Sequence, residues 1–296
     1  MAIFGWLIGA LGHDAGHFSV SHIPLINDIC VWGMSFLCNP IMWQHQHTYA
    51  HHSFTNQFDH DPDLHHFSLL LKVHQRFQNN PIYSWQRNPL VVFMAYTLVV
   101  FGTCVWIPIG MLRDGSLYGL VEYTDRHRPW RAFGMMAHLA SYVVLVMIVP
   151  FWTASTWYKA LGAVILHVAT SGLLFGMFSQ INHLNESSLM VEQRHNDKAK
   201  SPFVAHSWAA SQVETSNNFC TNSAVWHVLS NGLNLQIEHH LFPGLNHSHL
   251  HRIAPIVKST CDEYGVMYKT YNSWTEIMGA TLSWLDKLSQ VDEISP

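Results

Sequence analysis

The chain has 296 residues, of which 49% are hydrophobic and only 11% are charged, against roughly 25% charged residues in soluble globular proteins. The formal net charge is -4 and the lysines and arginines are scattered, so the sequence lacks the basic patch of a nucleic-acid-binding protein and nucleic acid is excluded as a partner. The 23 histidines outnumber the 15 lysines and arginines and stand in tight clusters, which indicates a metal site.

The first segment, residues 1–12, is apolar but too short to cross a bilayer, which takes about 20 residues of helix. It has neither the basic start nor the cleavage site of a signal peptide, and it runs directly into a histidine pair. We therefore expect residues 1–12 to be the end of a truncated membrane span.

The motif H-D-A-G-H follows, with His13 and His17 four residues apart. This spacing places both imidazoles on one face of a helix, where they can bind one metal ion, although such a pair also arises by chance. Asp14 is a candidate acceptor for the second ring proton of a metal-bound histidine.

A second cluster, W-Q-H-Q-H-T-Y-A-H-H-S-F-T-N, contains His47, His51 and His52. Adjacent residues of a helix project about 100° apart, so His51 and His52 can serve two different metal ions while His47 joins one of them. This pattern suits a dinuclear centre. We expect His45, in the same motif, to be a surface residue.

A polar segment comes next, and Pro62 interrupts any helix there. Its titratable residues are Asp59, His60, Asp61, Asp63, His65 and His66. We expect a solvated turn rather than metal ligands, with Asp59 or Asp61 as a candidate to orient a histidine.

Three stretches have the length and apolar character of membrane spans: residues 89–112, 133–153 and 155–180. If the histidine clusters meet at one site, an even number of crossings separates them, because metal ligands gather on one side of the membrane. We therefore expect 133–153 and 155–180 to cross as a hairpin. Residues 89–112, with prolines near both ends, are expected to lie in the interface or to re-enter the membrane.

The loop between residues 113 and 131 carries four arginines, whereas the turn between the two predicted crossings has only Lys159. The positive-inside rule then places this loop and the histidine clusters in the cytosol. Within the spans, we expect His138 and His167 to make hydrogen bonds between helices. A helix over Trp274–Leu288 is expected near the C-terminus.

The third cluster is Q-I-E-H-H, with the adjacent pair His239 and His240. His183, at the end of the last predicted crossing, is a further candidate ligand, with a plain interface residue as the alternative. Gln236 and Glu238 are candidates to contact the metal-binding histidines without binding the metal ion themselves. Eight imidazoles exceed the four ligands of a structural zinc site, so a pair of iron ions fits the count better, although counting leaves a two-zinc hydrolase open.

The motifs H-D-A-G-H, Q-H-T-Y-A-H-H-S-F-T-N and G-L-N-L-Q-I-E-H-H-L-F-P resemble the three histidine boxes of membrane fatty-acid desaturases. Gln236 in place of a histidine resembles the front-end subgroup, which is often fused to cytochrome b5. The resemblance implies that the iron ligands are His13, His17, His47, His51, His52, His239 and His240, with His183 as an additional one. We find no haem-binding H-P-G-G motif in the sequence and expect a single desaturase domain over residues 1–296, without a cytochrome b5 domain.

The fold implied by this resemblance is an all-α helical integral membrane bundle with interfacial helices and a cytosolic, histidine-rich di-iron cap. The implied reaction is the O2-dependent desaturation of a long-chain acyl lipid or acyl-CoA in the endoplasmic reticulum membrane. Two iron ions carry the chemistry, and electrons come from NAD(P)H through cytochrome b5 and its reductase. The alternatives are a sphingolipid desaturase, an acyl hydroxylase on the same scaffold, or a membrane metal-binding or transport protein.

Overall fold

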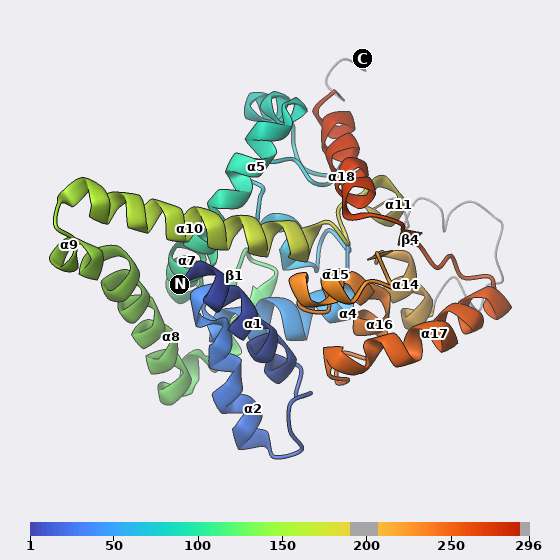
Figure 1. The fold of residues 1–296 in the computed structure, drawn as a ribbon, viewed down its shortest axis with the longest axis horizontal. Helices are drawn as coiled ribbons and strands as arrows, with labels where there is room; N and C mark the ends of the chain where they lie inside the picture. The colour runs from blue at the N-terminus through green and yellow to red at the C-terminus, as the bar shows by residue number, and fades with distance from the viewer. Residues whose placement is uncertain (190–206, 291–296) are drawn as a thin grey trace. The chain divides into compact units, whose positions relative to one another are not determined.

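The computed structural model describes residues 1–189 and 207–290, and these residues are mostly helical (Figure 1). The strands within them are short and form a pair β1–β2 and a pair β3–β4. Together with three helical segments suited to crossing a membrane, this confirms the predicted all-α membrane class.

The elements are given in chain order, with η for 3-10 and π-helices. Up to residue 114 they are α1 (Ala2–Gly16), α2 (Pro24–Cys30), η1 (Val31–Phe36), α3 (Pro40–Trp43), η2 (Gln44–His51), α4 (His52–Phe54), η3 (Pro62–His65), η4 (Pro81–Arg87), α5 (Pro89–Thr97), α6 (Val99–Phe101), η5 (Gly102–Trp106) and α7 (Ile107–Asp114). Then follow β1 (Ser116–Leu117), β2 (Val121–Glu122), η6 (Thr124–His127), α8 (Pro129–Tyr142), η7 (Val143–Ile148), α9 (Val149–Thr153), α10 (Trp157–Gln180), α11 (Glu186–Leu189), α14 (Trp208–Glu214), β3 (Asn218–Phe219), α15 (Ala224–Leu229), η8 (Leu233–Leu235), α16 (Gln236–Leu241), η9 (His247–His249), α17 (Leu250–Tyr264), β4 (Thr270–Tyr271) and α18 (Trp274–Ser289).

The chain divides into two compact units, each assembled from separate segments. The first unit comprises Met1–Ser53, Asp59–His65 and Phe93–Met177. The second comprises Phe54–Phe58, His66–Val92 and Phe178–Pro296. The first two histidine boxes therefore belong to the first unit, and His183 and the third box belong to the second. The single desaturase domain over residues 1–296 stays a prediction.

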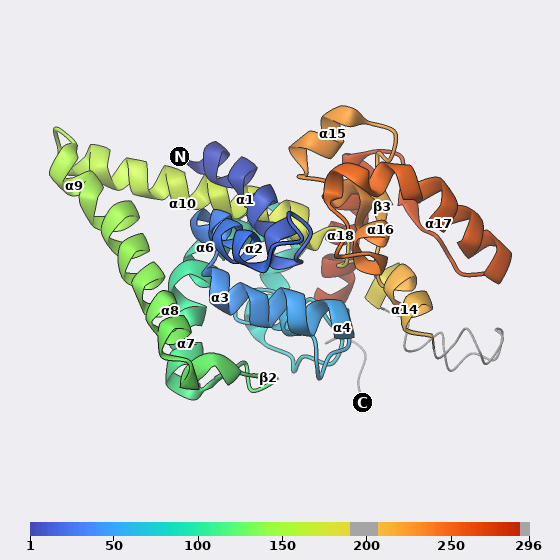
Figure 2. The same ribbon diagram turned by 90° about the horizontal axis from the view of Figure 1, so that it is seen from below.

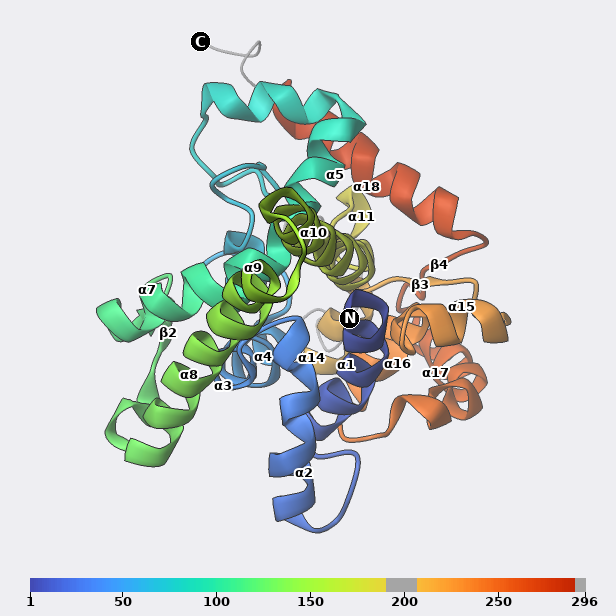
Figure 3. The ribbon, with the colours of Figure 1, turned by 60° about the vertical axis from the view of Figure 1, so that its left-hand side comes forward.

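In the first unit, α1 packs closely on η1 and α2 (Figure 3). Glycines at the contact make this approach possible: a Cβ atom added at Gly33 would lie 2.7 Å from the carbonyl oxygen of Ile8. Gly12 of α1 faces the backbone of Met34 in η1, and Gly5 and Gly9 face the side chains of Phe36 and Leu37. Small residues let helix backbones approach each other, and here they fix the helix that carries the first box.

Three helical segments are long and apolar enough to cross a membrane: Pro89–Asp114, Pro129–Thr153 and Trp157–Gln180. Their mean hydropathies are 2.3, 2.1 and 1.8. Figure 1 shows α8 and α9 joined to α10 by a tight turn, as the predicted hairpin requires, and the crossing of the membrane by these helices stays a prediction. Pro89–Asp114 also has the length of a span at 26 residues, so its position in the interface stays a prediction.

A polar contact links the first of the hairpin helices to the segment before the second box. The Nδ1 atom of His138 lies 3.2 Å from Nδ2 of Asn39, and its Nε2 atom lies 2.9 Å from the carbonyl oxygen of Ser35. The predicted hydrogen bonding between helices is thus confirmed for His138. It is wrong for His167, whose two ring nitrogens are buried and make no hydrogen bond to any described residue. Asn39 also caps the start of α3 by accepting from the backbone N–H groups of Ile41 and Met42.

In the second unit, α16 packs against α14 and α17 (Figure 2). The contact is apolar and contains Val213 of α14, Ile237 of α16, and Val257 and Cys261 of α17. Burial of these side chains holds α16, and with it the third box, in place. The predicted C-terminal helix is present as α18, and its Trp284 donates a hydrogen bond to the carbonyl oxygen of Val73.

Candidate metal centre

The first box lies where α1 ends. His13 is in the last turn, His17 caps the helix, and their ring centroids are 5.0 Å apart. Gly16, between them, faces the indole ring of Trp43, and any Cβ atom there would overlap that ring. The glycine lets Trp43 reach the second box, where its ring stacks on His47 at 4.8 Å.

The second box is a π-helix, η2, rather than the α-helix that the sequence analysis assumed. In a π-helix the backbone hydrogen bonds join residues five apart, and this geometry is frequent at functional sites. As a result His47 and His52, five residues apart, lie side by side with their Nε2 atoms 3.2 Å from each other. The ring centroids of His47 and His51 are 5.2 Å apart, so the predicted pair also meets.

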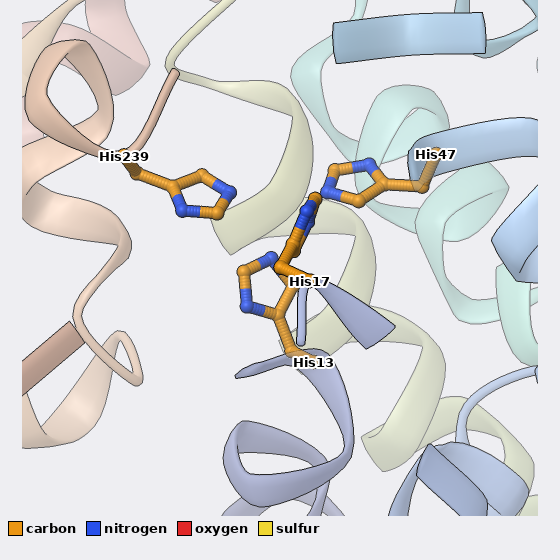
Figure 4. A group of neighbouring side chains, drawn as sticks. All are labelled: His13, His17, His47 and His239. Carbon is orange, nitrogen blue, oxygen red and sulfur yellow. The ribbon is translucent and has the colours of Figure 1, made fainter. Parts of the chain in front are cut away.

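The first unit therefore brings both of its boxes together. The ring nitrogens that His13, His17 and His47 direct toward one another lie within 4.8 Å (Figure 4). His17 also lies close to His52, with ring centroids 4.4 Å apart. Such a group of buried and half-buried imidazoles has the donor chemistry that a transition-metal ion requires.

Asp61 contacts the second box directly. The Nδ1 atom of His51 lies 3.0 and 3.1 Å from the two carboxylate oxygens of Asp61, and both residues are buried. Burial lowers the pKa of His51, but the charges of Asp61 and Asp63 and the hydrogen bond to Asp61 outweigh burial and raise this pKa to about 9. An ionised carboxylate only accepts, so Nδ1 carries a proton. With a pKa of about 9, Nε2 is protonated as well in the metal-free protein, and a metal ion that binds Nε2 would displace that proton.

The neighbouring carboxylate, Asp63, lies between His47 and His51. Its Oδ2 atom is 3.9 Å from Nδ1 of His47 and 3.5 Å from Nδ1 of His51. Its Oδ1 atom accepts a hydrogen bond of 2.6 Å from Gln46. Burial lowers the pKa of His47 to about 4, against the opposing effect of Asp63, so this imidazole is neutral at physiological pH and suited to bind a metal ion.

Two expectations about this region were wrong in part. His45 is 2% exposed rather than on the surface, and its Nε2 atom lies 3.0 Å from Oδ2 of Asp125. Arg131 also pairs with Asp125, so His45 is buried because it joins a buried ion pair. Asp59 and His60 are exposed as the predicted turn requires, but Asp61 is fully buried against His51.

In the second unit, His183 and His240 face each other with ring centroids 4.6 Å apart. The Nδ1 atom of His183 donates to the backbone carbonyl oxygen of Thr215 at 3.0 Å. The Nδ1 atom of His240 lies 2.8 Å from Oε1 of Gln212, which also accepts a hydrogen bond from the hydroxyl of Thr55. A carbonyl oxygen only accepts, so both histidines carry their proton on Nδ1. Nε2 of His183 then accepts from the side-chain amide of Gln236 at 3.0 Å, and Nε2 of His240 is the nitrogen that could bind a metal ion.

The residues named as candidates to support the ligands divide into two groups. Asp14 lies 3.7 Å from Nδ1 of His13, and Nε2 of Gln236 lies 3.0 Å from Nε2 of His183. Glu238 instead accepts hydrogen bonds from Asn218 and Tyr268, each 2.7 Å long, while burial raises its pKa. His239, on the same helix, has its ring 5.7 Å from that of His240.

A sequence model described as "Fatty acid desaturase" matches residues 1–272 of this chain. The chain belongs to the fatty acid desaturase family. No solved structure is significantly similar to it.

Several members of this family with assigned names are similar to the chain. It is 24% identical to the sn-1 linoleoyl-lipid 6-desaturase of Synechocystis sp. over 95% of its own length and 76% of that protein. It is 28% identical to the acyl-lipid (8-3)-desaturase of Mortierella alpina, with 92% and 60% covered. It is 26% identical to Delta(8)-fatty-acid desaturase 2 of Arabidopsis thaliana, with 91% and 58% covered. The chain thus spans less than two thirds of the last two relatives, and the predicted resemblance to front-end desaturases is confirmed.

Several residues that hold the candidate ligands were missed in the sequence. Gln212, Thr55 and the carbonyl group of Thr215 all support a histidine, but none belongs to a residue type that binds metal ions in these boxes. Gln212 lies 28 residues before His240. Folding brings them together through the contact between α14 and α16, which no spacing in the sequence reveals.

The residues of both units fit the iron pair that the family implies. In each unit, buried imidazoles approach one another through ring nitrogens, and His51, His183 and His240 each have the remaining nitrogen held by an acceptor. This arrangement, in which a metal-binding histidine donates its other N–H to a carboxylate or carbonyl group, is the usual one in metalloproteins.

Proposed function

We propose that this chain is an O2-dependent di-iron desaturase that introduces a double bond into a long-chain fatty acyl substrate. The observation that carries the proposal is the orientation of His51 and His240, each of which directs Nδ1 to an acceptor, so that Nε2 is the nitrogen that would meet a metal ion. This orientation is typical of metal-binding histidines, and the chain belongs to a family of desaturases.

The proposed iron ligands are the imidazoles of the three boxes and the histidine after the last span. They are His13, His17, His47, His51, His52, His183, His239 and His240. Asp14 and Gln236 are proposed to support them, because each lies beside one of these histidines. Glu238 is proposed to act indirectly, by fixing α16 through Asn218 and Tyr268.

The overall reaction removes two hydrogen atoms from adjacent methylene groups of the acyl chain and reduces O2 to two water molecules with two electrons and two protons. Bound iron supplies the activation of O2 that no side chain provides. The protein holds the ligand rings in one orientation through Asp61, Thr215 and Gln212. We propose that the electrons come from NAD(P)H through cytochrome b5 and its reductase.

An acyl chain carried by a membrane lipid is the proposed substrate. Two of the named relatives are an sn-1 linoleoyl-lipid 6-desaturase and an acyl-lipid (8-3)-desaturase, and three helical segments of this chain are suited to crossing a membrane. We propose that the protein resides in the endoplasmic reticulum with its histidine boxes facing the cytosol, since the arginine-rich loop between residues 113 and 131 follows the positive-inside rule.

The test is expression in a yeast strain that is supplied with polyunsaturated fatty acids and coexpresses cytochrome b5 and its reductase. Gas chromatography with mass spectrometry of each lipid class should show one new double bond with the wild type and none with His240→Ala. His251→Ala is the matched control, because His251 is exposed on α17, and it should retain activity. A hydroxylated product would identify the protein as an acyl hydroxylase instead of a desaturase. A new double bond confined to sphingolipids would identify it as a sphingolipid desaturase. Absence of any product from a well-expressed wild type would contradict the proposal.

A further inference from the structure

The segment H-D-P-D, His60 to Asp63, follows the second histidine box and belongs to none of the three boxes. Asp61 is buried with no exposed surface, which is rare for a carboxylate unless it has a partner. Its two oxygens face Nδ1 of His51 at 3.0 and 3.1 Å. An ionised carboxylate is costly to bury, so this contact places a specific charge beside the second box.

The local structure fixes this carboxylate. Pro62 begins the short helix η3, and the Oδ1 atom of Asp61 accepts a hydrogen bond of 2.9 Å from the backbone N–H of Asp63. This is the usual way in which an aspartate caps the start of a helix. The same turn directs Asp63 toward Gln46 and the rings of His47 and His51. The turn therefore holds its two carboxylates against one side of the π-helix η2.

The acceptors of the histidines in the second unit are different. His183 donates to the backbone carbonyl oxygen of Thr215, and His240 donates to the side-chain amide of Gln212. Both acceptors are neutral. Hydrogen bonds to an ionised acceptor are roughly twice as strong as those between neutral groups, and a charged acceptor makes the imidazole a stronger donor to a metal ion.

We propose that Asp61 is a positioning residue of the metal centre, which holds His51 with Nε2 available to iron and strengthens it as a ligand, with Asp63 supporting the same imidazole at longer range. The inference rests on the proposed di-iron function and adds to it the dependence of His51 on the negative charge of a fully buried carboxylate. The iron ion bound by His51 accordingly depends on a negative charge, whereas His183 and His240 depend on neutral hydrogen-bond acceptors.

The test compares Asp61→Asn, which keeps the shape but removes the charge, with Asp61→Glu, which keeps the charge, and with Asp59→Asn. Asp59 is exposed two residues away and serves as the matched control. Iron affinity is measured on purified protein in detergent by competition with a calibrated chelator, and the ligand field is followed by the absorption bands of the cobalt(II)-substituted protein. We expect Asp61→Asn to lower iron affinity roughly 10- to 100-fold and to shift the cobalt bands. Asp61→Glu should recover part of the affinity, and Asp59→Asn should match the wild type.

A protein with Asp61→Asn that binds iron as tightly as the wild type and has the same cobalt spectrum would overturn the proposal. If this variant does not fold, Asp63→Asn removes the second negative charge beside His51, at a side chain that is partly exposed. It should lower iron affinity by a smaller factor, and an unchanged affinity would overturn the proposal equally. Lipid analysis of the wild type distinguishes failure of this inference from failure of the proposed function. A wild type that forms product, with variants of unchanged iron affinity, refutes only the role of Asp61. A wild type without iron or product refutes the di-iron function.

Discussion

The Nδ1 atom of His240 lies 2.8 Å from Oε1 of Gln212, and both side chains are buried in the second unit. The same amide oxygen accepts a hydrogen bond of 2.9 Å from the hydroxyl of Thr55. An oxygen that accepts from two donors fixes the orientation of the amide as well as the tautomer of the histidine. Gln212 thereby aligns a proposed iron ligand without being one.

We predict that Gln212→Ala lowers iron affinity roughly 10- to 100-fold, because the imidazole of His240 loses the acceptor that orients it. Iron retained per chain after passage over a chelating resin measures the effect. Ser211→Ala, one position earlier on α14 and only partly buried, is the control and should retain its iron. Equal retention by the two variants would refute the orienting role of Gln212.

The close contact between α10 and α5 gives a prediction about stability. A Cβ atom at Gly172 would lie 2.5 Å from the carbonyl oxygen of Thr97 and 2.6 Å from that of Tyr96, whereas one at Gly162 would meet no described atom within 4 Å. We expect Gly172→Ala to lower the free energy of unfolding by roughly 1–3 kcal/mol, as overpacking does. Thermal unfolding in detergent should show this loss for Gly172→Ala and little or none for Gly162→Ala. A similar melting temperature for both would show that α10 and α5 are not packed so tightly.

Gln236 occupies the position at which the sequence resembles the front-end subgroup, and its Nε2 atom lies 3.0 Å from Nε2 of His183. We predict that Gln236→His lowers product formation, because a second imidazole there competes with His183 for the same space and metal ion. The measurement is the yield of the unsaturated product relative to the amount of expressed protein. Turnover equal to that of the wild type would assign Gln236 a purely structural role.

The sequence was informative wherever a single residue type or a local spacing carries the signal. The proximity of His13 to His17 and of His47 to His51 was predicted from their four-residue spacing, and the helices α8 to α10 were predicted from apolar length. The scarcity of charged residues indicated a membrane protein, and the all-α bundle followed from the resemblance of the histidine boxes to those of desaturases.

The rest depended on contacts between distant residues. The π-helix of the second box was missed because its hydrogen-bond pattern leaves no mark on the spacing that distinguishes it from an α-helix. His45 was assigned to the surface because Asp125, its partner, is 80 residues away. Asp61 was named as a candidate acceptor for a histidine, and its contact with His51 confirms this role. Its burial was not predicted, because a D-P-D sequence is typical of a solvated turn and only packing against η2 buries it.

The measurement that tests the central claim most directly is the metal content of the purified, detergent-solubilised protein after expression in iron-replete medium. Elemental analysis should find about two iron ions per chain, because the eight proposed ligands, seven histidines of the three boxes and His183, exceed what one metal ion requires. In His51→Ala or His240→Ala, the iron content should fall while the protein still inserts into the membrane. About one zinc ion per chain and no iron in the wild type would contradict the account.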